Sequence, residues 1–221
     1  MQSLSELDQV IRNRKTSKVL SSSPLEGGLD KDLLIEMIET AGTAPFHIAA
    51  AAEHRVGELD SFSPWRFHIV GKDICLKLRQ HLIDQGDHSK VPNMLAATDT
   101  LIQVTWCPDP VDPGFTLTER WEYCPSRNNM EHIAATAAAV QNLLLVATER
   151  GIDSYWSSGG PLRSDAVFEH LEIPTNQVLL GSVFLFANEL QEEDVEIKPG
   201  KMRDKKGTID SWARWVEELK L

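Results

Sequence analysis

Residues 129–150 limit most strictly what this chain can fold into. The segment is rich in alanine, contains neither Gly nor Pro, and stops at Gly151, a residue typical of the position just after a helix. Its apolar residues occupy almost every side, which is the pattern of a helix buried inside a domain. We therefore predict one long central helix that the rest of the chain must cover.

The remaining segments alternate between strand and helix patterns. Apolar runs and period-two alternation predict strands at residues 64–70, 100–106, 152–156 and 178–186. Helical spacing predicts shorter helices at residues 5–14, 30–40, 74–83 and 165–171. With no internal repeat and no low-complexity linker, residues 1–221 are interpreted as a single α+β domain with a mixed central sheet flanked by helices. A Pro-rich excursion at residues 108–125 is interpreted as a flap, and residues 188–221 as a C-terminal extension.

The charge balance excludes one class of partner. The chain carries 33 acidic and 22 basic side chains, a formal net charge of -11. A nucleic-acid-binding surface requires a surplus of Lys and Arg, so we expect no nucleic-acid partner. The bases are nevertheless uneven, because many of them lie at residues 12–18 and 198–206. A small local phosphate site therefore remains compatible with this sequence.

Other patterns make a membrane, a metal or a disulfide framework unexpected. No stretch approaches the ~20 apolar residues of a membrane span, and the N-terminus lacks the pattern of a signal peptide. The three cysteines form no C-x-x-C pair, and no His or Cys residues fall at metal-ligand spacing. We expect a cytoplasmic protein with reduced thiols, no membrane partner and no metal.

Two basic segments are candidates for an anion site. Arg14, Lys15 and Lys18, with the hydroxyl groups of Thr16 and Ser17, offer donors suited to phosphate, although a solvated helix end explains the same residues. Lys201 and Arg203 form a second basic group far along the chain, which a solubilising tail explains equally well.

A third segment, residues 155–160, combines small residues with paired glycines. Such a segment lets a backbone approach a flat ligand and exposes N–H donors, although an ordinary turn after a strand is the alternative. Taken together, the three segments suit one phosphorylated cofactor with a flat ring.

The order of motifs resembles the nitroreductase family of FMN-dependent oxidoreductases over nearly the whole chain, and its small, minimal-scaffold members in particular. The resemblance rests on six segments in family order: the basic opening at residues 13–18, Ala44-Pro45-x-His47 with Pro64-Trp65-x-Phe67, the helix at 137–151, Trp156-Ser157-Ser158-Gly159, the strand region at 173–181, and Lys201-x-Arg203.

The resemblance implies an intertwined homodimer with one FMN in each active site at the dimer interface. It assigns the cofactor's phosphate to Arg14 and Thr16, with Lys15 close by, and to Lys201 and Arg203.

The same resemblance assigns the ring end of the cofactor. It places Lys18 near the ribityl chain or pyrimidine edge, a one-residue slip to Ser17 remaining open. Trp156 and the backbone of Ser157, Ser158 and Gly159 would face the isoalloxazine, with one N–H at N5, while His47 would bear on the flavin or its dimer mate.

The implied activity is ping-pong hydride transfer. NADH or NADPH would reduce the flavin at N5, and a small acceptor such as a nitroaromatic, quinone or enone would reoxidise it. No catalytic side chain is implied, because the cofactor carries the chemistry.

Two departures from the family pattern keep alternatives open. Residues 48–63 are an insertion, interpreted equally well as a lid over the substrate pocket or as a surface loop. Ser157 stands where the subgroup has arginine, and the S-x-N-x-Q motif before Pro64 is missing. The alternatives are a specialised flavoenzyme on the same fold, such as a reductive dehalogenase or flavin-consuming enzyme, and a non-catalytic flavin-binding or scaffold dimer.

Overall fold

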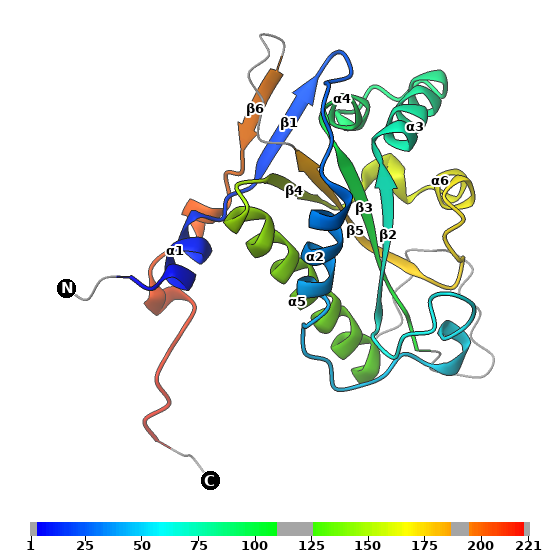
Figure 1. Ribbon diagram of the computed structural model, residues 1–221. Coiled ribbons are helices and arrows are strands. Elements are labelled where there is room, and N and C mark those ends of the chain that lie inside the picture. The colour runs from blue at the N-terminus through cyan, green and yellow to red at the C-terminus, as the bar shows by residue number, and fades with distance from the viewer. Residues whose placement is uncertain (1–3, 110–125, 187–194, 219–221) are drawn as a thin grey trace.

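The computed structural model describes residues 4–109, 126–186 and 195–218, so most of the predicted flap lies outside the described residues. A four-stranded sheet forms the centre, in the order β2 (Trp65–Gly71), β3 (Thr100–Trp106), β5 (Val178–Phe186) and β4 (Asp153–Ser157) (Figure 1). Two further strands, β1 (Ser17–Ser21) and β6 (Val195–Pro199), pair with each other in a separate ladder.

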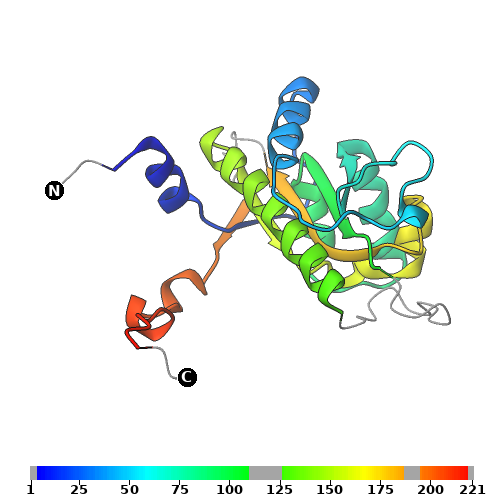
Figure 2. The ribbon, with the colours of Figure 1, turned by 90° about the horizontal axis from the view of Figure 1, so that it is seen from below.

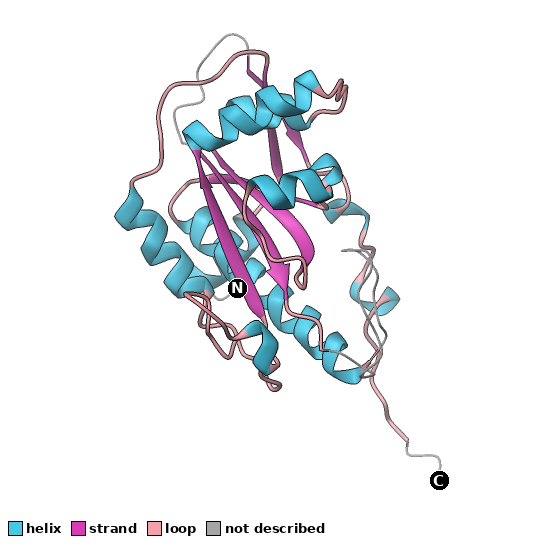
Figure 3. Ribbon diagram, turned by 90° about the vertical axis from the view of Figure 1, so that its right-hand side faces the viewer, coloured by secondary structure: helices cyan, strands magenta, loops and turns pink. Residues whose placement is uncertain are grey.

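Helices cover both faces of the central sheet. α2 (Lys31–Ala41) and α5 (Arg127–Glu149) pack on one face, and α3 (Lys72–Asp84), α4 (Val91–Ala97) and α6 (Asp165–His170) lie on the other (Figures 2 and 3). The predicted α+β class is confirmed, but the central sheet is antiparallel rather than mixed, because all pairings among the described strands are antiparallel.

The two central strands divide the core between these layers. Along β3, Ile102 and Val104 face the α2–α5 layer, while Leu101 packs with the α3–α4 layer. Along β5, Val183 and Phe184 show the same alternation. Both strands are therefore buried on both faces, which explains the nearly continuous apolar sequence of β5. β3 also buries the polar side chains of Thr100, Gln103 and Thr105.

The long helix α5 is confirmed, but the single chain buries only one side of it. Ala139, Val140, Leu143 and Ala147 pack on the sheet, whereas Met130 is 59% exposed. By length and composition α5 could also cross a membrane, since a window in it has a mean hydropathy of 1.3. The expectation that no stretch is long and apolar enough for a membrane span was therefore wrong. The packing of α5 across the sheet accounts for its apolar character.

The other predicted strands and helices are confirmed within a few residues, with three omissions. The sequence reasoning missed β1, β6 and α4. α4 is short and begins with Val91-Pro92; Pro92 lies in its first turn, where proline is tolerated because its missing N–H has no helical partner.

The two ends of the chain project from this body. Helix α1 (Glu6–Asn13) has no buried residue, although Ser5 and Asp8 form a capping box at its start. The C-terminal segment contains two short 3-10 turns, η3 (Arg203–Lys205) and η4 (Ile209–Ser211), and lies beside α1, away from the sheet (Figures 1 and 2).

Candidate functional site

The β1–β6 ladder brings the two basic segments of the sequence together. Its register places Ser17 opposite Pro199 and Lys18 opposite Lys198, and it ends where the Gly200 N–H donates to the Thr16 carbonyl at 2.8 Å. Like charges opposite each other destabilise a ladder. Here the Glu196 carboxylate lies 2.8 Å from the Lys198 Nζ atom and so reduces that repulsion.

Gly200 sets how closely the two segments approach. A Cβ atom at this position would lie 2.9 Å from the Thr16 Cβ, closer than side-chain carbons approach in folded proteins. The absence of a side chain therefore lets β6 end against Thr16 and directs the following residues toward Arg14.

A cavity of about 800 Å³ lies at this junction. Its lining comprises Arg14, Lys15, Thr16, Tyr155, Pro199, Gly200, Lys201, Met202, Arg203 and Lys206. Five of these side chains are basic and none is a carboxylate. In a chain with a net charge of -11, this cavity is a local positive region suited to an anion.

Two guanidinium groups face the cavity without a neutralising partner in its lining. Arg203 donates through both terminal nitrogens to the carbonyls of Arg12 and Arg14, at the end of α1. Burial, and secondarily the charge of Arg203, lower the pKa of Arg14. Since arginine stays charged in proteins, the pair gains from an anion with several oxygen acceptors, and a phosphate group fits this donor set.

The neighbouring residues of β1 differ in what they can contact. Lys18 places its Nζ atom 4.5 Å from the centre of the Tyr155 ring, which itself lines the cavity. The Ser17 hydroxyl is buried and donates to Asp153 at 2.8 Å. Of the two registers left open by the sequence, Lys18 is therefore the residue adjacent to the cavity.

The segment from Trp156 to Gly159 lies at the end of β4, outside the lining of the cavity. The Trp156 indole lies over Gly181, where a Cβ would stand 2.4 Å from its Nε1 atom. The Gly159 N–H donates to the Ser157 Oγ at 3.2 Å, whereas no hydrogen bond of the Ser158 N–H is found among the described residues.

Arg163 supports this segment from the following turn, η2 (Gly160–Arg163). Its Nε donates to the Ser158 carbonyl, and its terminal nitrogens donate to Leu179 at 2.7 Å and Leu180 at 3.2 Å. The family subgroup has an arginine at the position of Ser157. In this chain Arg163, from the next turn, holds the backbone of the segment instead.

His47 is not brought to the cavity within one chain. It is exposed in the segment after α2, beside Phe46, whose ring meets Trp65 edge-on at 5.5 Å. Of the residues that the sequence singled out, the structure gathers Arg14, Lys15, Thr16, Lys201 and Arg203. It places Lys18 next to them, and Trp156, Ser157, Ser158, Gly159 and His47 outside the lining.

Five lining residues were not among the predicted site residues: Tyr155, Pro199, Gly200, Met202 and Lys206. Tyr155 and Lys206 nevertheless lie in the segments 155–160 and 198–206 that the sequence pattern singled out. Gly200 directly precedes the basic pair and follows Pro199, a signal of a turn that sequence reasoning could have used.

Neither described cysteine suits nucleophilic chemistry. Cys75 and Cys107 are free and buried, and burial raises the pKa of their thiols to about 12 and about 11. Within residues 4–109, 126–186 and 195–218, no cluster of three His, Cys, Asp or Glu side chains forms a metal-ligand set.

Comparison with known proteins places these features in a family. Residues 11–185 match the model of the Nitroreductase family. A protein of Bacillus subtilis (strain 168) named "Putative NAD(P)H nitroreductase YfhC" is 28% identical over 178 residues, covering 78% of this chain and 79% of the relative.

Solved structures share the fold. A nitroreductase-like family protein from Bacillus cereus matches with a TM-score of 0.65 at 22% identity, covering 99% of this chain and 100% of that chain. A nitroreductase from Bacteroides fragilis NCTC 9343, crystallised with bound FMN, matches with a TM-score of 0.57 at 20% identity, covering 93% and 99%.

Proposed function

The chain belongs to the nitroreductase family, and from this we propose that it is an FMN-dependent oxidoreductase that uses NADH or NADPH as electron donor. The observation that carries the proposal is the cavity between β1 and β6, which five basic side chains and no carboxylate line. A relative of the same fold is crystallised with FMN, whose phosphate suits such a cavity.

The phosphate end of the cofactor belongs at the junction of the two basic segments. Arg14 and Arg203 supply charge-assisted donors, Thr16 supplies a hydroxyl, and Lys15 and Lys201 supply further positive charge. Lys18 and the Tyr155 ring lie at the side of the cavity from which β4 leads toward Trp156. They would therefore flank the ribityl chain, which joins the phosphate to the flavin ring.

The ring end belongs at the segment from Trp156 to Gly159. Because the Gly159 N–H is engaged by Ser157, we assign the Ser158 N–H as the donor toward the flavin. Arg163 holds the Ser158 carbonyl and so fixes the orientation of that peptide. When bound, FMN supplies the chemistry of hydride transfer, and the chain's residues bind and orient it.

The acceptor that completes a ping-pong cycle is proposed to be a small nitroaromatic, quinone or enone. We also propose the cytoplasm as the compartment, a proposal supported by the free thiols of Cys75 and Cys107.

A homodimer is the proposed assembly. α1 exposes Leu7 and Ile11, and the C-terminal segment exposes Trp215 at 91%. The outer side of α5 is also incompletely covered, with Met130 exposed. Apolar side chains on two projecting segments and on a long helix suit an intertwined partner, and such a partner would allow His47 to reach a second active site.

The phosphate assignment is tested by comparing FMN with riboflavin. Arg14→Ala combined with Arg203→Ala removes charge-assisted contacts, each worth about 1.5–3 kcal/mol. We expect the FMN dissociation constant to rise by at least about 100-fold, at the low end of that range. Riboflavin, which lacks the phosphate, should bind the variant and the wild type alike. Unchanged FMN affinity would contradict the assignment.

The organised insertion at residues 48–63 favours a second candidate, a specialised flavoenzyme on the same fold. Arg66 fixes this segment by several hydrogen bonds to its carbonyls. A specialised enzyme would show one acceptor, or the flavin itself, consumed far faster than a panel of nitroaromatics, quinones and enones.

A further inference from the structure

The insertion at residues 48–63 is fixed to the sheet by a buried arginine. Arg66, on β2, is 3% exposed and donates to the carbonyls of Ser63 and Trp65 at 2.7 Å, of His54 at 2.8 Å and of Ser61 at 3.0 Å. A buried guanidinium is costly unless it is hydrogen-bonded, and these bonds satisfy both terminal nitrogens, while the Nε atom has no partner among the described residues. The four bonds tie the fold of the insertion to β2.

Further contacts close the insertion on itself. The Ala50 N–H donates to the Phe62 carbonyl at 2.9 Å, and the Arg55 guanidinium lies 4.4 Å from the centre of the Phe62 ring. The short turn η1 (Ala52–His54) lies between these contacts, and the His54 Nε2 donates to the Pro108 carbonyl at 2.8 Å. The insertion is therefore held in a defined conformation by its own contacts and is not a loose surface loop. It forms a wall beside the sheet.

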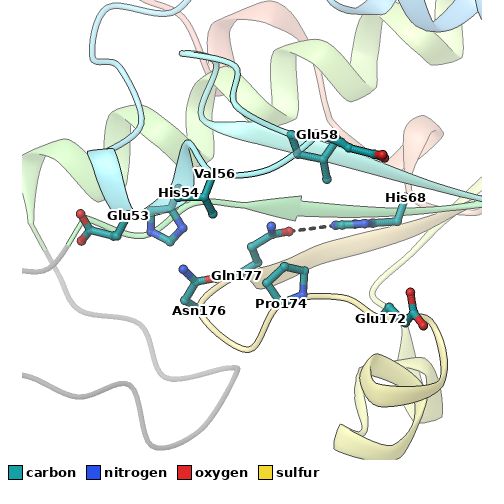
Figure 4. A pocket seen from close by; sticks show the side chains of 10 residues that line it. Glu53, His54, Val56, Glu58, His68, Glu172, Pro174, Asn176 and Gln177 are labelled. Atoms are coloured by element: carbon teal, nitrogen blue, oxygen red, sulfur yellow. Dashed lines mark hydrogen bonds between the residues drawn. The ribbon is translucent and has the colours of Figure 1, made fainter.

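Behind this wall lies a cavity of about 380 Å³. It shares no residue with the cavity between β1 and β6 that is proposed to hold the FMN phosphate, which we call the flavin cavity. The insertion forms one side, β2 contributes His68, and the loop between α6 and β5 forms the other side (Figure 4). Val56, Leu59 and Pro174 give it apolar surface. Its volume suits a small organic molecule.

A hydrogen-bond chain fixes His68 in one state. Gln177, which is 3% exposed, accepts through Oε1 from the Thr105 hydroxyl at 2.6 Å and from the His68 Nε2 at 2.8 Å. Burial lowers the pKa of His68, so the ring is neutral with its proton on Nε2. Its Nδ1 is then an acceptor that has no partner among the described residues.

A second histidine in the lining shows the same pattern. His54 is 6% exposed, and its ring extends from the insertion toward Asn176 (Figure 4). Since Nε2 donates to the Pro108 carbonyl, Nδ1 carries a lone pair, and this buried atom has no hydrogen-bond partner in the part of the chain that the structure describes. Burial lowers the pKa of His54 as well.

The charges of the lining point to one kind of ligand. Glu53, Glu58 and Glu172 line the rim, and neither Lys nor Arg is among the described residues that line the cavity. Two arginines of the wall do not line the cavity: carbonyls inside the wall engage the terminal nitrogens of Arg66, and the Arg55 guanidinium lies on the Phe62 ring. Acceptors thus dominate in the cavity, and a ligand with positive charge and N–H donors complements them.

We propose that this cavity is a second binding site, separate from the flavin cavity, for a small organic cation with a primary amine or amidinium group. The amine donates to the imidazole acceptors while the carboxylates at the rim supply the charge, and the apolar wall takes the rest of the ligand. The insertion then serves to build this site.

The test uses three probes of one shape: phenethylamine, 2-phenylethanol and phenylacetate, titrated into the full chain by calorimetry with FMN present. We expect phenethylamine to bind about tenfold more tightly than the alcohol, and phenylacetate not to bind here, as expected for ion pairs at a partly exposed rim. The cationic flavin cavity has the opposite preference, so the charge order identifies which cavity is occupied.

Variants locate the binding. Glu58→Gln with Glu172→Gln should weaken phenethylamine by about tenfold, while Glu26→Gln with Glu39→Gln, an equal change of net charge at exposed positions outside both cavities, should leave it unchanged. Equal affinity for all three probes, or equal loss in both double variants, would overturn the proposal. These outcomes are independent of whether FMN binds.

Discussion

Replacing Gly200 by alanine tests whether the β1–β6 ladder shapes the phosphate site. The new Cβ would lie 2.9 Å from the Thr16 Cβ and 3.4 Å from its Oγ1. Carbon atoms pack at about 3.5–4.0 Å, so the two segments must separate by about 0.6 Å or more. The hydrogen bond from the Gly200 N–H to Thr16 lengthens as a result.

The energetic cost follows from overpacking. Forcing one extra methyl group into a close contact costs about 1–3 kcal/mol. If this strain is relieved by displacing the segment that carries Lys201 and Arg203, FMN affinity falls by about 5–150-fold. Riboflavin affinity should change little, because the displaced groups are those proposed to contact the phosphate.

Titration of the apoprotein with FMN, followed by quenching of flavin fluorescence, measures the effect. Gly28→Ala is the matched control, because a Cβ at Gly28 would meet no atom within 4 Å. An FMN dissociation constant that is the same in Gly200→Ala, Gly28→Ala and wild type would refute the reasoning that this close approach builds the site.

Three further predictions concern other parts of the fold. Arg163→Met should lower the free energy of unfolding in urea by about 1–3 kcal/mol, since it removes charge-assisted bonds to the Ser158 and Leu179 carbonyls; an unchanged urea midpoint would contradict this. Glu172→Gly should raise that free energy by about 0.5–1 kcal/mol in the same assay, because Glu172 has a φ of 53° in the left-handed region; a loss of stability would show that the side chain matters more than its backbone strain. Burial lowers the pKa of His54, so the unfolded state binds more protons, and the free energy of unfolding should fall as the pH drops below about 6.5. Urea unfolding measured across that range should show a weaker pH dependence in His54→Gln than in the wild type. The same pH dependence in both proteins would refute the role of His54.

Strand β5 was predictable because burial on both faces leaves an almost continuous apolar run, and β3 was predictable because four of its seven residues are apolar. Thr100–Trp106 and Val178–Phe186 were predicted with the bounds that the structure shows. The ladder of β1 and β6 was not predicted, because each strand has only five residues and polar side chains interrupt the apolar ones, as Lys18 and Glu196 illustrate. β1 is buried at four of its five positions, but two of these are Ser17 and Ser21, so its burial leaves no apolar periodicity to detect.

The basic residues of the proposed phosphate site could be predicted from the sequence, but the contacts that bring them together could not. The two basic segments stood out against an acidic chain, and the family resemblance suggested that they meet. The pairing of β1 with β6 and the close approach at Gly200 bring them together. Pro199-Gly200 signals a turn, but no local sequence signal identifies the strand that lies against it. The cavity behind the insertion was also beyond prediction, because it depends on His68 and Gln177, which lie far apart in the sequence.

The measurement that tests the proposed function most directly is the flavin spectrum of the purified chain, followed by anaerobic stopped-flow mixing with NADH and NADPH separately. We predict a yellow protein that binds FMN and loses its visible flavin absorption band when it is mixed with NADH, NADPH or both. A colourless protein that fails to bind added FMN, or bound FMN that neither nucleotide reduces, would contradict it.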